Sequence, residues 1–320
     1  MGKALDSGSA EGQGEPQAAS STAGKRPEQK LISNERETAG PDLAGVARPR
    51  LAARTSGEDS LPAPAEVSTR SILGVPIAMI DYEGAMDVMD GMVARRERGY
   101  VCAVAVHAVM VSRRDPEMRA AVAGSSLTVP DGMPLVWAAN ALGDDLDNRV
   151  YGPELMDRYS SRCAEKGHRV WLYGGRDQGS LMQLALNMRR RHPGIEIVGG
   201  YSPPFRPLTA EEEDALVDQI NGARPDVLWV GIGVPKQEKW MAHMRERLDV
   251  PVMCAVGAAF DFHSGRISQA PPWMQARGLE WIYRIAQEPR RLLPRYVLYN
   301  PAFLFAFARQ LGREKLRRRR

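Results

Sequence analysis

Residues 225–240 read PDVLWVGIGVPKQEKW and contain one complete structural unit. Val227 to Val230 form a continuous run of large apolar residues, as in a strand that is buried on both faces of a sheet. Two glycines and a proline interrupt this run, and the amphipathic segment 236–247 then predicts a helix. A buried strand, a glycine turn and a helix in succession are the repeating unit of parallel α/β sheets.

The same alternation extends along the chain in both directions. One helix, at 209–222, carries a capping box, because Thr209 is followed by Glu212 three residues later. We therefore predict an α/β fold of the Rossmann-like class, in which a mostly parallel sheet has helices on both faces and a C-terminal helical, basic appendage follows. The predicted strands span 77–80, 100–106, 126–129, 169–173, 195–198, 227–231 and 252–256, and the predicted helices span 82–96, 116–123, 134–142, 154–165, 178–190, 209–222 and 236–247.

Composition divides the 320 residues into three segments. Residues 1–70 contain no Phe, Tyr or Trp and are rich in small and polar residues, which predicts a disordered N-terminal extension. Residues 71–265 are expected to form the α/β core, and 266–320 the appendage. Three cysteines, no apolar signal segment and no stretch long enough to span a bilayer indicate a cytoplasmic protein.

The appendage is strongly basic. It is expected to form helices at 271–288 and 300–317, separated by Pro289 and Pro294. Residues 284–320 contain eleven Lys and Arg but only two Glu, whereas the whole chain has a net charge of +4. This charge predicts an anionic partner, and Phe and Leu interspersed among the arginines favour a membrane surface. A docked terminal helix with a solvated end is the alternative. Nucleic acid is not expected, because no recognised binding module accompanies the arginines.

Functional side chains are expected where the strands end, because ligands bind parallel sheets beyond their carboxyl edge. Asp131 follows a predicted strand and precedes a predicted helix. Its neighbour Gly132 would allow a ligand to approach the backbone closely. Asp131 is therefore a candidate catalytic carboxylate. The alternative is an aspartate that only caps the helix or forms an Asx-turn.

Two glycine-rich turns are candidate phosphate sites, because backbone N–H groups at a helix start bind anions. Neither turn matches the P-loop or the dinucleotide fingerprint. An ordinary turn is the alternative for each. The candidate binding residues are Gly231, Gly233, Lys236, Gln237 and Glu238 in one turn and Gly174 and Gly175 in the other.

Asp261 and a set of arginines complete the candidate site. Asp261 follows the strand at 252–256 and could accept hydrogen bonds from a base or sugar, or pair with a nearby arginine. Guanidinium groups suit a diphosphate because their planar fork matches its oxygens, and surface ion pairs are their ordinary alternative. No metal site is expected, since the five histidines are scattered. The arginines are Arg149, Arg284, Arg290, Arg291 and Arg295.

These motifs, in this order, resemble the WecG/TagA/CpsF glycosyltransferases, glycosyltransferase family 26. The similarity spans roughly residues 73–299, and its most specific blocks are PKQE and GLEW. The carrying segments are PDGMP (130–134), RVYG (149–152), LYGG (172–175), residues 225–240, VGAAFDF (256–262) and GLEWIYR (278–284).

The resemblance implies an inverting, metal-independent enzyme that needs no cofactor and works in cell-surface polysaccharide synthesis. It would move N-acetylmannosamine or a hexose from a UDP-sugar to a polyprenyl-pyrophosphate-linked sugar. By position, Asp131 is similar to the family's candidate general base, Arg149 and Gln237 to crevice residues, and Asp261 to a uracil-contacting residue. The arginine-rich appendage resembles the part that docks on the inner face of the cell membrane and closes over the site. Family analogy also suggests self-association.

The chain departs from the family pattern at residues 103–105. They read Ala-Val-Ala where the family usually has Thr-x-Asn, so two polar side chains are missing from the expected crevice. Gln269 likewise replaces the family's usual arginine. An alternative is therefore a catalytically weak homologue that binds UDP-sugar or lipid carrier as a scaffold or regulator. A nicotinamide-dependent oxidoreductase is disfavoured by the absent fingerprint.

Overall fold

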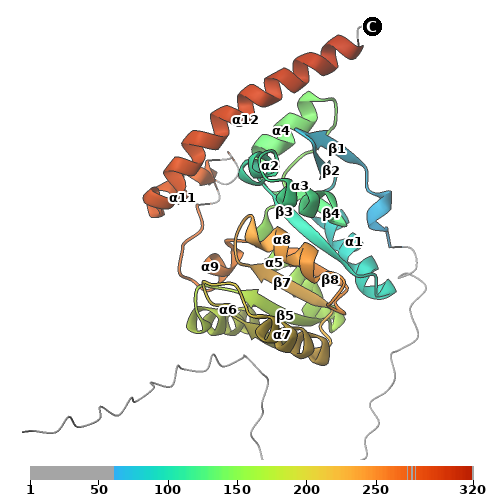
Figure 1. Ribbon diagram of the computed structural model, residues 1–320, viewed down its shortest axis with the longest axis vertical. Coiled ribbons are helices and arrows are strands. Elements are labelled where there is room, and N and C mark those ends of the chain that lie inside the picture. Colours follow the sequence, from blue (N-terminus) through green and yellow to red (C-terminus); the bar gives the residue numbers. More distant parts are fainter. Residues whose placement is uncertain (1–60, 272, 275–276, 278, 319–320) are drawn as a thin grey trace, which may run out of the picture.

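The computed structural model describes residues 61–318 except 272, 275–276 and 278. Six strands form one parallel sheet in the order β4-β3-β8-β7-β5-β6 (Figure 1). This confirms the predicted fold class. The strands are β3 (Gly99–Val104), β4 (Leu127–Pro130), β5 (Arg169–Gly174), β6 (Glu196–Tyr201), β7 (Val227–Gly231) and β8 (Val252–Ala255).

Helices cover both faces of the sheet. Each face encloses its own cluster of buried apolar side chains. One cluster includes residues of α1 (Tyr82–Arg95), α5 (Gly152–Lys166), α6 (Gln178–Arg191) and α9 (Ala259–His263). The other includes residues of α2 (Val106–Ser112), α3 (Pro116–Ala123), α4 (Met133–Ala141), α7 (Ala210–Ala223) and α8 (Lys236–Met244). The predicted capping box at Thr209 and Glu212 is present at the start of α7.

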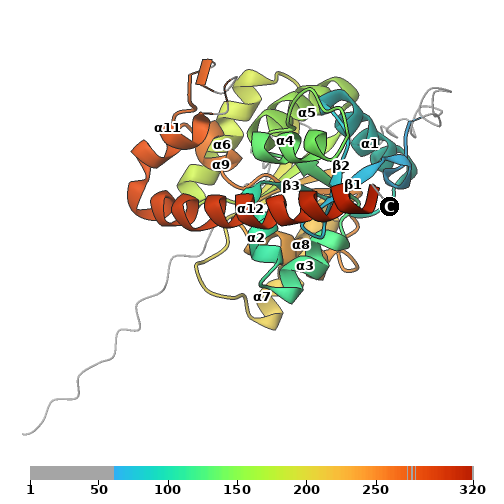
Figure 2. The same cartoon turned by 90° about the horizontal axis from the view of Figure 1, so that it is seen from above.

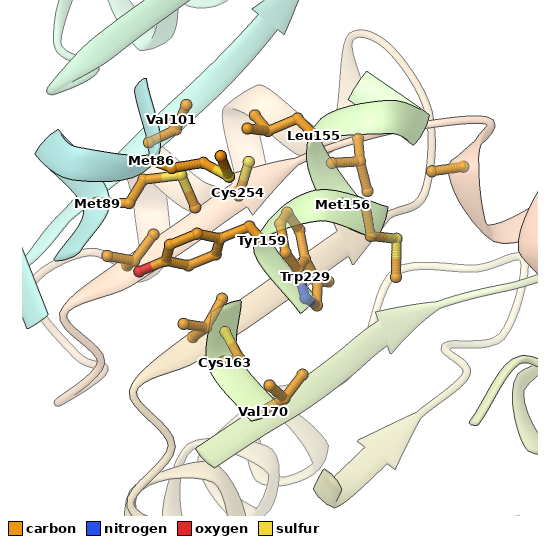
Figure 3. Close-up of a cluster of buried hydrophobic side chains, with 14 of the residues drawn as sticks. Met86, Met89, Val101, Leu155, Met156, Tyr159, Cys163, Val170, Trp229 and Cys254 are labelled. Atoms are coloured by element: carbon orange, nitrogen blue, oxygen red, sulfur yellow. The ribbon is translucent and has the colours of Figure 1, made fainter. Parts of the chain in front are cut away.

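The run of apolar residues in β7 lies at the centre of the core, as its sequence predicted. Trp229 is fully buried, and its ring meets that of Tyr159 edge-on with 6.2 Å between centroids. Figure 3 shows Met86 and Met89 of α1 on one side of these two rings and Met156 of α5 on the other. The Tyr159 hydroxyl donates a hydrogen bond of 3.0 Å to the buried Asp90. β7 therefore holds the loop that follows it in a fixed position at the sheet edge.

Three elements differ from the sequence predictions. Residues 77–80 were expected in the main sheet. Residues 77 and 78 belong instead to β2 (Val75–Ala78), which pairs antiparallel with β1 (Thr69–Ile72) in a separate hairpin. The hairpin turns at Leu73 and Gly74, both with positive φ, as a tight two-residue turn requires. The short helices α2 and α9 were not predicted, because seven and five residues are too few to show a helical period.

The expected disordered extension, residues 1–70, lies outside the described residues up to position 60. From residue 61 onward the chain packs on the core. Arg95 of α1 donates to the carbonyl oxygens of Leu61 and Pro62 at 3.0 and 3.3 Å, and β1 begins at Thr69.

The C-terminal region forms α11 (Glu280–Gln287) and one long helix, α12 (Pro289–Arg318). The expected break at Pro289 and Pro294 was wrong. Pro289 is the first residue of α12, where a missing N–H costs nothing, and Pro294 lies inside the helix. Burial of Leu292 and Phe303 offsets the lost backbone hydrogen bonds. α12 crosses α2 and runs on towards the hairpin (Figures 1 and 2). Among the described helices, none has the length and apolar character needed to cross a bilayer.

Candidate functional site

Four loops lie at the carboxyl edge of the sheet, because the strands before them are parallel and belong to the same sheet. Asp131 follows β4, Gly175 follows β5, Gly233 follows β7 and Gly257 follows β8. At Gly174 the backbone of β5 approaches β7 so closely that a Cβ would lie 2.5 Å from the carbonyl oxygen of Gly231. The two glycine turns therefore lie side by side.

Asp131 is held at this edge by backbone hydrogen bonds on both sides. Its N–H donates to the Val104 carbonyl at 2.8 Å, and Val150 N–H donates to the Pro130 carbonyl at 2.8 Å. Its Oδ1 accepts a 2.6 Å hydrogen bond from the N–H of Gly152, the first residue of α5. The alternative that Asp131 caps the helix following it is wrong, since Gly132 is the N-cap of α4 and no side chain caps it. The carboxylate instead satisfies the start of α5.

The second oxygen of Asp131 is not engaged. Oδ2 forms no hydrogen bond within the described part of the chain, and the side chain is half-buried rather than enclosed. Burial raises the pKa of Asp131, and the nearby Glu280 raises it further. The Gly152 N–H, Arg149 and Arg284 act in the opposite direction. A carboxylate with one anchored oxygen and one free oxygen has the properties of a proton acceptor.

Arg149 and Glu280 form a buried ion pair beside Asp131. Arg149 Nη2 donates to Glu280 Oε2 at 2.5 Å, and the guanidinium lies 4.3 Å from the centre of the Tyr151 ring. The Tyr151 hydroxyl donates to the other oxygen of Glu280. Glu280 is only 5% exposed and joins α11 to the segment before α5. Glu280 belongs to the GLEW block, but no role was predicted for it from the sequence.

The remaining arginines divide into two groups. Arg284 and Arg295 contribute to the field around Asp131, and burial lowers the pKa of Arg295. Arg291 donates instead to Glu288, and Arg290 is exposed, with no hydrogen bond or ion pair in the described residues. The structure thus brings two of the four predicted C-terminal arginines to the carboxylate.

The loop between β7 and α8 is stabilised by hydrogen bonds from side chains at the start of α8. Gly233 N–H donates to Gln237 Oε1 at 3.1 Å, and Gln237 Nε2 donates to Glu238 Oε1 at 2.9 Å. Gln237 and Glu238 are 2% and 0% exposed, so their side chains do not extend into open space, contrary to expectation. Lys236 is exposed. Pro235 precedes α8 rather than forming its first residue. In this arrangement the expected donor Gln237 positions the loop.

Glu238 has an unusual environment for a carboxyl group. Its Oε2 has no hydrogen-bond partner among the described residues, and burial raises its pKa to about 7. An unfolded chain ionises this group near pH 4.5. Between these pH values the folded protein retains a proton that the unfolded chain releases, so the free energy of unfolding falls as pH rises.

We expect Glu238 to lower the free energy of unfolding by about 3 kcal/mol as the pH rises from about 5 to about 8. Glu238→Gln should remove this decline, because its side chain is neutral throughout. Urea unfolding of both proteins at a series of pH values measures the difference. Glu246→Gln, at an exposed position, is the control. Equal slopes for the wild type and Glu238→Gln would contradict the assignment.

Asp261 is held by Arg176, which was one of the two alternatives for it. Arg176 Nε and Nη2 donate to its two carboxylate oxygens at 3.1 and 3.3 Å, and Arg176 Nη2 also donates to Glu288 at 3.1 Å. Asp261 lies in α9, close to the carboxyl edge. A contact between Asp261 and a uracil stays a prediction. No three His, Cys, Asp or Glu side chains of the described residues are grouped as metal ligands.

The two alanines at the departure from the family pattern lie in this site. A Cβ on Gly152 would be 3.4 Å from Ala103 Cβ, and one on Gly132 would be 3.7 Å from Ala105 Cβ. Ala105 is also the N-cap of α2, where no side chain makes a capping hydrogen bond. The missing polar groups are therefore next to Asp131, as the sequence predicted. A Cβ on Gly132 would make only ordinary contacts with the protein, and the close approach of a ligand there stays a prediction.

Comparison with known proteins identifies relatives of this chain. The chain matches the glycosyl transferase WecG/TagA/CpsF family over residues 70–317. Among curated proteins it is similar to two called N-acetylglucosaminyldiphosphoundecaprenol N-acetyl-beta-D-mannosaminyltransferase. The protein from Bacillus spizizenii (strain W23) is 29% identical over 58% of this chain and 71% of the relative. The protein from Bacillus subtilis (strain 168) is 25% identical over 72% of this chain and 91% of the relative.

Proposed function

This chain belongs to the WecG/TagA/CpsF family of glycosyltransferases, and from that we propose that it transfers N-acetylmannosamine or a hexose from a UDP-sugar to a polyprenyl-pyrophosphate-linked sugar. Both relatives are named for transfer of N-acetylmannosamine to an N-acetylglucosaminyl diphosphoundecaprenol. The observation that carries the proposal is Asp131, whose free oxygen lies among positively charged groups at the sheet edge.

In the proposed reaction, a hydroxyl of the acceptor sugar attacks the anomeric carbon of the donor as UDP leaves from the opposite face. The configuration inverts, and Asp131 Oδ2 takes the hydroxyl proton. The leaving diphosphate gains negative charge that Arg284 and Arg295 can offset without a metal ion. The positive charge of Arg149 favours the ionised form of Asp131, and the ion pair with Glu280 holds the Arg149 guanidinium in place.

We further propose that the enzyme works at the inner face of the cell membrane, where its lipid-linked acceptor resides. α11 and α12 expose an unusual number of large apolar side chains, which water disfavours and a bilayer surface would cover. This agrees with the basic amphipathic character of their sequence. Self-association and the absence of a nucleic-acid partner stay predictions. The exposed residues are Trp281, Ile282, Leu293, Val297, Leu298, Leu304, Phe305 and Leu316.

The decisive experiment incubates the full chain with detergent-dispersed polyprenyl-pyrophosphate sugar and a panel of UDP-sugars. We expect release of UDP that depends on the acceptor, with one donor favoured over the rest. Ala103 and Ala105 beside Asp131 favour a second candidate, a homologue that binds substrate as a scaffold with little turnover. Donor binding without turnover on any acceptor would select the scaffold, and binding of NAD but not of UDP would contradict both.

A further inference from the structure

A basic groove lies at the far end of α12 from the candidate site. It has a volume of about 870 Å³ and is bounded by α12, the end of α2 and the turn between β1 and β2. Figures 1 and 2 show α12 beside α2 and the hairpin in both views. The arginines that line the groove are Arg113, Arg114, Arg309, Arg313 and Arg317.

The groove is fixed to the core and does not depend on a loose tail. The side chain of Gln310 accepts from Leu73 N–H at 2.8 Å and donates to the Ser71 carbonyl at 2.8 Å. Phe303, about two turns earlier, is 2% exposed. Fourteen residues separate Arg295 from Arg309, which places the groove about 20 Å along the helix from the arginines near Asp131.

The arginines of the groove have few carboxylate partners among the described residues. None of the five arginines forms an ion pair with a carboxylate of the described residues, although Arg114 and Arg309 lie over the rings of Tyr299 and Phe305. Glu314 is the one acidic residue that lines the groove, and its carboxylate accepts from Gln310. Arg309, Arg313 and Arg317 follow one another at four-residue spacing, an arrangement of like charges that destabilises a helix. An anion in the groove would remove this repulsion.

Apolar side chains on the same face of α12 indicate what carries the anion. Leu298, Phe305 and Leu316 are separated by seven and eleven residues, so they lie on one side of the helix, next to Arg309. They are 52%, 67% and 65% exposed. A small soluble anion would leave these side chains in water, whereas an anionic phospholipid supplies both a phosphate and a hydrocarbon surface.

We propose that this groove binds the phosphate of an anionic phospholipid headgroup and thereby holds the distal half of α12 on the membrane. The inference rests on the proposed function at the membrane, but it assigns a separate site. Planar guanidinium groups from α12 and from Arg113 and Arg114, directly after α2, would bind the phosphate oxygens from two sides.

The test compares sedimentation of the full chain with phosphatidylcholine vesicles and with vesicles that also contain phosphatidylglycerol. For the double variant Arg113→Gln/Arg114→Gln we expect roughly 30-fold weaker binding to the anionic vesicles, about fivefold for each arginine near such a surface. Binding to neutral vesicles should not change. The Arg113→Lys/Arg114→Lys variant retains the positive charge but loses the planar guanidinium group, which can donate two hydrogen bonds to one phosphate. It should therefore also bind more weakly than the wild type.

Arg190→Gln/Arg224→Gln is the control of equal charge, because both side chains are exposed and form no ion pair within the described part of the chain. It should bind like the wild type. A lysine variant that binds fully, or a control that weakens equally, would show diffuse charge attraction and overturn the proposal. So would thermal stabilisation of the wild type, but not of the glutamine variant, by glycerol 1-phosphate alone, because that result identifies a soluble ligand. A wild type that binds no vesicle would contradict membrane docking itself, and UDP-sugar binding should be equal in all variants.

Discussion

Asp131→Asn is expected to reduce turnover by a factor of about 10² to 10⁴, the usual contribution of a positioned general base. The amide oxygen of asparagine can still accept the Gly152 N–H, so α5 should keep its hydrogen bond and the fold should persist. The amide cannot, however, take a proton from the acceptor hydroxyl. Acceptor-dependent release of UDP measures the loss.

Two measurements distinguish this loss from a structural defect. UDP-sugar affinity and the free energy of unfolding should stay close to those of the wild type. Asp147→Asn, at an exposed position between α4 and α5, is the matched control and should retain full turnover. A turnover of Asp131→Asn within a few-fold of the wild type would mean that another group accepts the proton.

The position of Asp131 could be predicted because it depends on local sequence alone. A carboxylate directly after a strand of a parallel sheet must lie at the carboxyl edge, whichever residues surround it. The same reasoning located the turns at Gly174 and Gly231. The close approach of these two turns, in contrast, follows from the pairing of β5 with β7. The order of strands in a sheet cannot be predicted from the local sequence of any one strand.

The partners of the site residues could not be predicted, because they are distant in sequence. Glu280 meets Arg149 across 131 residues, and Arg176 meets Asp261 across 85. Local reasoning also misjudged Gln237, whose polar side chain suggested an exposed donor. The structure buries it, because the amide satisfies Gly233 and Glu238 within one turn. Polar residues next to a glycine turn can therefore support a loop instead of binding its ligand.

The path of the C-terminal helix depended on tertiary contacts as well. Pro294 suggested a break, and Pro301 also lies inside α12; an isolated helix loses about 3 kcal/mol at each internal proline. Burial of Leu292 and Phe303 is of comparable size, at about 1.5 to 3 kcal/mol for each large apolar side chain. Packing on α2 thus stabilises α12 as one continuous helix. Arg295 and the arginines of α12 in the basic groove therefore belong to the same helix.

Glu280→Ala is expected to lower the free energy of unfolding by about 3 kcal/mol. It removes the carboxylate that pairs with the largely buried guanidinium of Arg149 and accepts from Tyr151, and an unpaired buried charge is costly. Because Glu280 also raises the pKa of Asp131, its loss should shift the acid limb of the turnover profile to lower pH. Urea unfolding and the pH dependence of UDP release measure the two effects.

A double-mutant cycle separates the ion pair from simple truncation of a side chain. Arg149→Met in the Glu280→Ala background removes the unpaired cation, so the double variant should be more stable than the sum of the two single losses predicts. Glu246→Ala, at a position whose carboxylate is 78% exposed and 3.9 Å from its nearest arginines, should cost less than about 0.5 kcal/mol. If Glu280→Ala costs no more than Glu246→Ala, α11 is not fastened to the site by this ion pair. Arg284, which follows Glu280 in α11, would then need another contact to remain near Asp131.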